Sequence, residues 1–243
     1  MRKTFCIVIL PCFLVAACVF AGCKANVFGR VGKGDIKSHT RDLTGFHSIR
    51  SNFSGDITVI LGNTYSVSIR GQDNIVEVLK TEVVDSTLKI AFDKTIKKHD
   101  SLAMYITMPR LRYIDHPGAG KFVVNSNISE PTFSITLTGK GSVWCKRIAA
   151  QSNLDLYNEG KGDLTVAAGS AQNAVLSVTS SGNIDAANVA LQKCEATLSG
   201  SGNISLFATQ VLTATISGSG NITYSGMAAL TQNITGTGQL IKK

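Results

Sequence analysis

The sequence predicts an all-β solenoid, and two observations support that prediction. Seven short glycine-centred turns recur through its second half, and the last glycines of successive turns are 21, 21, 20, 20, 18 and 18 residues apart. Between the turns, apolar and polar side chains alternate, which is typical of a strand with one buried face. The regular period predicts stacked coils of about 18–21 residues, each burying its apolar side chains on the next. The turn glycines are Gly120, Gly141, Gly162, Gly182, Gly202, Gly220 and Gly238.

The alternation is clearest in the segments that lead into the turns. Residues 134–138 read Ser-Ile-Thr-Leu-Thr, and residues 213–217 read Thr-Ala-Thr-Ile-Ser. Glycine at the turn permits a tight corner, and its missing side chain lets neighbouring coils approach closely. A flexible glycine-serine linker is the alternative interpretation, but such a linker would lack the interleaved Ile, Leu and Val.

Asparagine follows the turn glycine in three consecutive coils, at Asn183, Asn203 and Asn221. If the coils are in register, these side chains stack and share amide hydrogen bonds along the solenoid. This structural ladder is the favoured interpretation over a catalytic or metal-binding role.

The N-terminal half shows a less regular version of the same design. Residues 46–49, 57–60, 65–69, 87–90 and 102–108 alternate as strands, whereas residues 76–84 fit either a strand or a short helix. Gly32-Lys33-Gly34 and Ser54-Gly55-Asp56 resemble the later turns, with Gly34 and Gly55 again 21 residues apart. An open first coil would expose strand edges, so this half is expected to form an irregular, strand-rich cap.

The first residues read as a targeting segment. Arg2 and Lys3 precede an apolar stretch over residues 5–20, and Ala21-Gly22-Cys23 closes it. Small residues directly before a cysteine resemble the bacterial lipoprotein signal, which predicts that Cys23 carries the lipid. Cys18 is the alternative attachment site, and an ordinary cleaved signal or a single membrane anchor are the alternatives to lipidation.

These features divide the chain into four parts. Residues 1–23 form the lipoprotein signal peptide, residues 24–45 a tether and entry segment, and residues 46–112 the N-terminal strand-rich part. Residues 113–243 form the glycine-repeat solenoid, continuous with the part before it.

The chemistry-bearing residues are sparse. Once the leader is set aside, Cys145 and Cys194 lie more than two coils apart, so no disulfide is expected and both should be small buried side chains. The four histidines are scattered, so neither a metal site nor a cofactor is predicted.

The net charge of +8 belongs to the N-terminal half and the leader. A nucleic-acid partner is not expected, because the chain has an export signal and no recognition motif. The basic cluster over residues 94–99 is interpreted first as a solvated strand face. Contact with anionic lipid or acidic glycan near the anchor is the alternative.

The order of motifs resembles a known family. A Gly-x-Gly opening is followed by the segments at residues 41–49, 55–59, 69–75, 88–90 and 108–111, and repeated Gly-Ser-Gly-Asn-Ile units finish the chain. This order resembles the bacterial family called putative auto-transporter adhesin, head GIN domain, found as lipoproteins in Bacteroidetes-like bacteria. The resemblance implies a right-handed parallel β-helix, and it supplies no catalytic residues.

Three classes of function remain open. The favoured one is a non-enzymatic cell-envelope lipoprotein that binds a glycan, a surface or an envelope protein, with Trp144 and Tyr157 on the outward parity as candidate contacts. The second is a structural or stress-linked envelope protein without a specific ligand. A polysaccharide-active enzyme is the least favoured, because it needs a convergent acid and base, and Asp163 and Asp185 are the nearest candidates for such a pair.

The predicted location is the cell envelope, with the protein held in the membrane by its N-terminal lipid. Lys24-Ala25-Asn26 lacks the acidic run after the cysteine that resembles a surface-export signal. Its absence favours a periplasm-facing position on the outer membrane over the cell surface.

Overall fold

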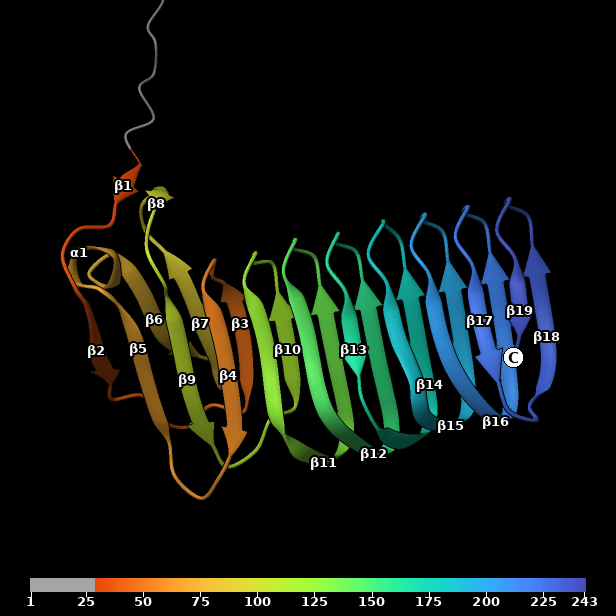
Figure 1. Ribbon diagram of the computed structural model, residues 1–243. Coiled ribbons are helices and arrows are strands. Elements are labelled where there is room, and N and C mark those ends of the chain that lie inside the picture. Colours follow the sequence, from red (N-terminus) through yellow and green to blue (C-terminus); the bar gives the residue numbers. More distant parts are fainter. Residues whose placement is uncertain (1–28) are drawn as a thin grey trace, which may run out of the picture.

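The computed structural model describes residues 29–243 as a stack of about six β-coils closed at its N-terminal end by a cap (Figure 1). The predicted signal peptide and both candidate lipid-attachment cysteines, Cys18 and Cys23, lie outside the described residues. The all-β solenoid predicted from the glycine period is confirmed. Within the described part of the chain, no helix has the length and apolar character that a membrane span needs.

Each coil has two arms, and the arms build two parallel sheets on opposite sides of the stack. We call the sheet that leaves the glycine turns face A. In spatial order it contains β9 (Ala103–Met108), β4 (Asp56–Leu61), the first parts of β11 (Lys121–Leu137) and β12 (Ser142–Asn158), β13 (Leu164–Val166), the first parts of β15 (Ile184–Leu198) and β16 (Ile204–Ile216), β17 (Ile222–Ser225) and β19 (Leu240–Lys242).

The sheet that returns to the turns is called face B. It contains β7 (Thr87–Phe92), β3 (Ser48–Asn52), β10 (Tyr113–His116), the second parts of β11 and β12, β14 (Gly169–Val178), the second parts of β15 and β16, and β18 (Ala229–Ile234). Because β11, β12, β15 and β16 each run from face A to face B, one continuous strand supplies both arms of a coil.

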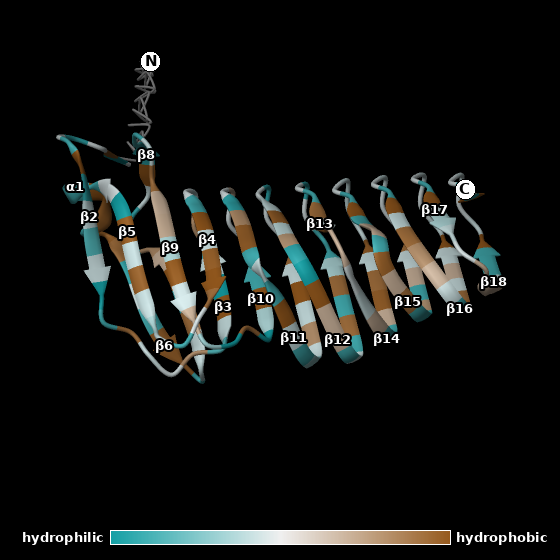
Figure 2. Cartoon of the chain, turned by 60° about the horizontal axis from the view of Figure 1, so that its bottom comes forward, coloured by the Kyte–Doolittle hydropathy of each residue, from teal (hydrophilic) through white to brown (hydrophobic). Residues whose placement is uncertain are grey.

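The core is a slab of apolar side chains between the two faces. Residues of one parity are buried along the strands of the inner coils, and the parallel register stacks them coil upon coil, which produces the alternating bands of Figure 2. In the last coil, β18 is exposed at all six residues because no further coil covers it. On face A the buried row is Ile57, Phe122, Val143, Leu164, Ile184, Ile204 and Ile222. The predicted alternation is therefore confirmed for the inner coils, where each Å² of buried apolar area stabilises the fold by about 25 cal/mol.

The glycine turns form the coil tips, a single edge along which face B passes into face A (Figure 1). The tips approach so closely that a Cβ atom on Gly202 would lie 1.9 Å from the carbonyl oxygen of Gly182. Each of the other turn glycines likewise faces the glycine carbonyl of the coil before it. Glycine is needed here for close approach, as the sequence predicted, because backbone packs directly on backbone.

Two buried polar side chains form hydrogen bonds with backbone groups of the coil tips. Asn158 donates to the carbonyls of Gly162 and Asn183 at 2.8 and 2.9 Å and accepts from the Gly160 N–H at 3.1 Å. His116 holds the same position two coils earlier, with Nε2 2.8 Å from the Gly120 carbonyl. Both are fully buried, so their hydrogen bonds satisfy turn groups that water cannot reach.

Antiparallel strands close the N-terminal end. β5 (Ser66–Gln72) pairs antiparallel with β9, and β2 (Ile36–Arg41) pairs antiparallel with β5, while β6 (Leu79–Val84) covers the edge of β7. The expected cap is thus present. Of the two alternatives for residues 76–84, the strand is observed as β6, while the short helix α1 (Asp73–Val76) lies before the segment and ends at its first residue.

The resemblance of Gly32-Lys33-Gly34 to a coil turn is wrong. Gly34 has a φ of +78°, and a Cβ there would meet nothing within 4 Å, so no coil stacks on it. Gly55, by contrast, lies directly under Gly120. The local motif misleads because the chain after Gly34 enters the antiparallel strand β2. Part of the segment expected as a tether, residues 24–45, therefore contributes a cap strand.

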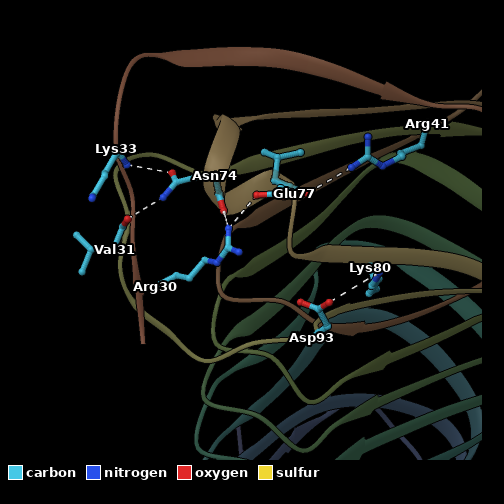
Figure 3. Close-up of polar contacts among 9 residues, drawn as sticks. Arg30, Val31, Lys33, Arg41, Asn74, Glu77, Lys80 and Asp93 are labelled. Carbon is cyan, nitrogen blue, oxygen red and sulfur yellow. Dashed lines mark hydrogen bonds and ion pairs between the residues drawn. The ribbon is translucent and has the colours of Figure 1, made fainter. Parts of the chain in front are cut away.

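The described chain starts on the tip side of the cap. β1 (Arg30–Val31) pairs in parallel with β8 (Ile96–Lys98). Arg30 bonds the Asn74 carbonyl at 3.1 Å and Glu77 at 2.9 Å, and Asn74 bonds the backbone of Val31 and Lys33 at 2.8 and 3.0 Å (Figure 3). These contacts fix the entry point of the chain against α1.

Candidate functional site

The three predicted ladder asparagines lie in register next to the coil tips. Asn203 donates its backbone N–H and its side-chain amide to Asn183 Oδ1, at 2.9 and 3.1 Å. Asn221 N–H donates to Asn203 Oδ1 at 3.0 Å. The ladder extends at both ends to residues that the sequence reasoning missed: Asn183 donates to Asp163 Oδ1 at 3.1 and 2.8 Å, and Asn221 accepts from the Gln239 N–H.

The order of residues in the ladder follows from hydrogen-bond chemistry. Each inner rung accepts a backbone N–H of the following coil, and the side-chain amides of Asn183 and Asn203 also donate to the preceding coil, which a carboxylate cannot do. Asp163 suits the first rung, where its side chain accepts two bonds from Asn183 and donates none. The signal for Asp163 was its position directly after Gly162, shared with the asparagines. Asp56, after Gly55, does the same for the Lys121 N–H at 3.1 Å.

The two predicted aromatic contacts, Trp144 and Tyr157, do not lie together. Trp144 lies on face A, paired with Val123 and Thr165, whereas Tyr157 lies on face B, paired with Thr136 and Ser177. Both are half-buried and point outward between buried neighbours. A flat ligand on one face could therefore contact only one of them.

Face A also presents an aromatic residue that the sequence reasoning missed. Tyr105 is 50% exposed and lies in the same outward row as Trp144. Ile60, 47% exposed, adds an apolar side chain on β4 beside that row. The outward row runs Tyr105, Thr58, Val123, Trp144, Thr165, Asp185, Ser205 and Thr223.

Face B is dominated by hydroxyl side chains. Its outward row runs Asp115, Thr136, Tyr157, Ser177, Thr197, Thr215 and Asn233. Burial raises the pKa of Asp155, and burial together with Asp155 and Glu195 raises the pKa of Tyr157. Asp115 is paired with Arg50 at 3.0 Å, yet burial raises its pKa. Tyr157 is thus neutral at physiological pH.

The carboxylates considered for an enzyme, Asp163 and Asp185, are diagonal neighbours on consecutive coils, and each is held by its own contacts. Asp163 lies beside Asn183 as the first ladder rung, while Asp185 lies beside Thr165 and Ser205 and accepts from the Ala187 N–H at 3.1 Å. Each carboxylate has its own hydrogen-bond partner. Among the described residues, no group of three or more His, Cys, Asp and Glu side chains could hold a metal ion.

The two described cysteines are free and buried. Cys145 lies on face A and Cys194 on face B, so the core separates them and no disulfide joins them. Burial raises the pKa of each thiol to about 12. Both are therefore apolar core side chains, as expected from the coil spacing.

A groove of about 650 Å³ lies where the cap meets the first coil tips. Its lining includes the apolar residues Phe92, Ile96 and Pro117, and Phe92 stacks on the buried Phe53 with ring centroids 5.8 Å apart. Lys94 approaches from the cap, and Lys140 and Lys161 from the coil tips. A smaller adjoining hollow shares Ser54 and Ile96 and adds Lys97 and Lys98. We call the two together the lysine groove.

The fold and these surfaces define a capped β-solenoid with rows of polar and aromatic side chains on two flat faces. The chain belongs to the family described as putative auto-transporter adhesin, head GIN domain, whose model matches residues 45–228. No curated protein matches the sequence.

Solved structures share the whole architecture. A putative adhesin from Bacteroides fragilis NCTC 9343 is 25% identical, with a TM-score of 0.83, covering 88% of this chain and 100% of its own. A putative adhesin from Parabacteroides distasonis ATCC 8503 is 22% identical, with a TM-score of 0.71 and coverages of 87% and 98%. A putative lipid binding protein from the same organism is 23% identical, with a TM-score of 0.65 and coverages of 88% and 99%.

Proposed function

We propose that this protein is a lipid-anchored, non-enzymatic adhesion module of the cell envelope, and that face A binds a glycan or an envelope protein. The observation that supports it most is the outward row of face A, where Tyr105 and Trp144 stand among hydroxyl-bearing residues. Aromatic rings stack on the apolar faces of sugars, and aromatic residues are enriched at protein interfaces. Membership of an adhesin family agrees with this function.

The stiffness of the stack suits such a role. Every coil is hydrogen-bonded to its neighbours along both faces, so the outward side chains keep a fixed spacing of about 4.8 Å from coil to coil. A rigid row loses little conformational entropy when it binds an extended partner. Asp163 accepts from Asn183 and Asp185 from the Ala187 N–H, so both carboxylates already serve the fold, which favours binding over catalysis.

The anchor and the binding face are tested separately. Metabolic fatty-acid labelling should be lost in Cys23→Ala and kept in Cys18→Ala, and the reverse would move the anchor to Cys18. Protease shaving of intact cells then decides between the periplasm and the cell surface.

For the binding face, a chain that starts at residue 24 is screened against a glycan array and envelope extract. The Tyr105→Ala/Trp144→Ala variant should bind at least tenfold more weakly than the parent. Tyr157→Ala, on face B, is the matched control and should bind normally. An equal loss in both variants would contradict the assignment of face A, and no saturable binding by the parent would contradict the adhesive function.

A further inference from the structure

We propose that the lysine groove docks the protein on the anionic phosphate headgroups of the membrane that holds its anchor. This inference rests on the lipid anchoring proposed above and adds an orientation to it: the coil tips nearest the cap face the bilayer. Face A and face B then stand away from the membrane and remain open to partners.

The charge of the groove is unbalanced. Five lysines line it, and Glu159 is the one carboxylate in its described lining. None of the ion pairs among residues 29–243 involves any of these lysines. The lysines are Lys94, Lys97, Lys98, Lys140 and Lys161, and all five are exposed. A surface with unpaired charges of one sign attracts counter-ions of the other sign.

The fold forces two of these charges together. Lys161 N–H donates to the Gly139 carbonyl at 3.0 Å, which sets Lys140 and Lys161 on consecutive coil tips. Neighbouring strands are about 4.8 Å apart, so the two lysines start from adjacent backbone positions, and like charges on adjacent strands repel each other. Phosphate groups placed over both ammonium groups would remove that repulsion. The following tips carry Ser181, Ser201, Ser219 and Thr237, so the basic charge is confined to the cap end of the edge.

The tether leaves the described structure at the wall of this groove. Arg30 pairs with Ile96, which lines both hollows, and its N–H donates to the Thr95 carbonyl at 2.8 Å. Figure 1 shows β1, β8 and the coil tips on the same side of the molecule. Cys23 precedes Gly29 by six residues, which span at most about 20 Å when extended. A lipid on Cys23 would therefore hold the groove next to the headgroups.

Proximity is also the reason to prefer a lipid surface over an acidic glycan as the partner. A tethered protein meets the headgroups at a high effective concentration, so weak contacts suffice, whereas a soluble polymer must be captured from solution. Each lysine near an anionic leaflet contributes about a fivefold gain in binding at low salt. The apolar lining residues Phe92, Ile96 and Pro117 suit the boundary between headgroups and acyl chains.

The test uses the full lipidated protein reconstituted in vesicles of phosphatidylcholine, with or without a quarter of phosphatidylglycerol. Acetylation of each lysine by an amine-reactive ester is followed by mass spectrometry. Lys94, Lys140 and Lys161 should react at least tenfold more slowly on the anionic vesicles, while Lys146 and Lys193 should change less than twofold. Salt at about 0.5 M should abolish the protection, because screening acts on exposed charges.

Variants sharpen the readout. Lys94→Gln/Lys140→Gln/Lys161→Gln should remove the protection of Lys97 and Lys98. The matched control, Lys146→Gln/Arg147→Gln/Lys193→Gln, removes the same charge from exposed residues away from the groove and should leave that protection intact. Equal acetylation on both vesicles, or uniform protection of all lysines, would overturn the proposal. Protection by soluble polygalacturonate without protection by anionic vesicles would assign the groove to an acidic glycan instead.

The same experiment separates the anchor from the groove. Retention of the protein on neutral vesicles depends on the lipid alone, so a protein that is not retained there would contradict the lipid anchor. The groove would then be tested by co-sedimentation with anionic vesicles. There the lysine-to-glutamine triple variant should bind about 100-fold more weakly than the parent, from about fivefold for each lysine. Equal binding of the two proteins would overturn the groove proposal whatever the state of the anchor.

Discussion

Replacing Gly202 by alanine tests whether close backbone packing at the coil tips holds the solenoid together. The new Cβ would lie 1.9 Å from the Gly182 carbonyl oxygen, whereas ordinary contact begins at 3.4 Å. The two tips must therefore separate by about 1.5 Å, which is about a third of the strand spacing. The opposing atom is backbone, so no side-chain rotation can relieve the overlap.

The expected cost follows from the bonds that span these two tips. Gly202 N–H donates to Ser180 at 3.0 Å, and Asn203 donates twice to Asn183 Oδ1 at 2.9 and 3.1 Å. A separation of this size takes all three beyond hydrogen-bonding distance. At about 1 kcal/mol net for each bond, the free energy of unfolding should fall by about 3 kcal/mol. Overpacking in well-packed sites costs a similar amount.

Urea unfolding followed by far-UV circular dichroism measures this loss. Ser201→Ala is the matched control, because it adds no atom, lies in the same tip and is exposed. It should stay within about 0.5 kcal/mol of the parent. If Gly202→Ala were also within about 0.5 kcal/mol, the tips would be free to part, and the packing argument for all seven turn glycines would fail.

Three further predictions concern the asparagine ladder, the buried Glu130 with its two arginine partners, and the thiols. Asn203→Ala removes the two hydrogen bonds of the Asn203 side chain, to Asn183 and from Asn221. Urea unfolding should show a free energy of unfolding lower by about 1–2 kcal/mol, and hydrogen exchange should be faster at the Asn221 amide, whereas Ser205→Ala should be neutral. Glu130 is buried, which raises its pKa, but bonds from Arg110 at 3.1 and 2.7 Å and from Arg112 outweigh this, so its pKa is below the usual 4.5. The Glu130 carboxylate therefore contributes its full stability above about pH 4.5, and this contribution is lost as pH falls through the folded pKa. Glu130→Gln should lower the free energy of unfolding by about 2 kcal/mol at pH 7 and should make that free energy fall less steeply as the solution is acidified. An equally steep fall in the variant and the parent would contradict this. Cys145 and Cys194, with pKa values of about 12, should resist a thiol reagent at pH 8 until the protein is unfolded, and rapid labelling of the native protein would show that the core opens.

The repeat half could be predicted from the sequence because its information is local and repeated. The sequence of each coil contains its own glycine turn and its own alternation of buried and exposed residues, so the pairing of Ile184 with Ile204 follows from the period alone. The cap could not be predicted in the same way, since antiparallel pairing is decided by partners far apart in the chain. Gly34 shows the difference: its motif copies a coil turn, but β2 pairs with β5.

The surfaces were less predictable than the coils for the same reason. Parity places Trp144 and Tyr157 outward, yet only the path of the chain assigns them to opposite faces. Tyr105 joins Trp144 through cap strands that break the period. The lysine groove combines Lys94 from the cap with Lys140 and Lys161 from the tips, residues that no sequence window contains together.

The tip edge of the stack differs chemically from its two flat faces. This difference explains how one solenoid could be held at a membrane and still bind a partner. The tips expose backbone-packed turns and, near the cap, lysine side chains. The flat faces expose hydroxyl and aromatic side chains in rows and include no part of the entry strand β1. A tether attached at the tip edge constrains that edge alone, so docking through the lysine groove and adhesion through face A would not compete for the same residues. Substitutions in the groove should therefore change the orientation on the membrane and its salt dependence, and leave the affinity of face A for its partner unchanged. Substitutions of Tyr105 and Trp144 should lower that affinity and leave the orientation and its salt dependence unchanged.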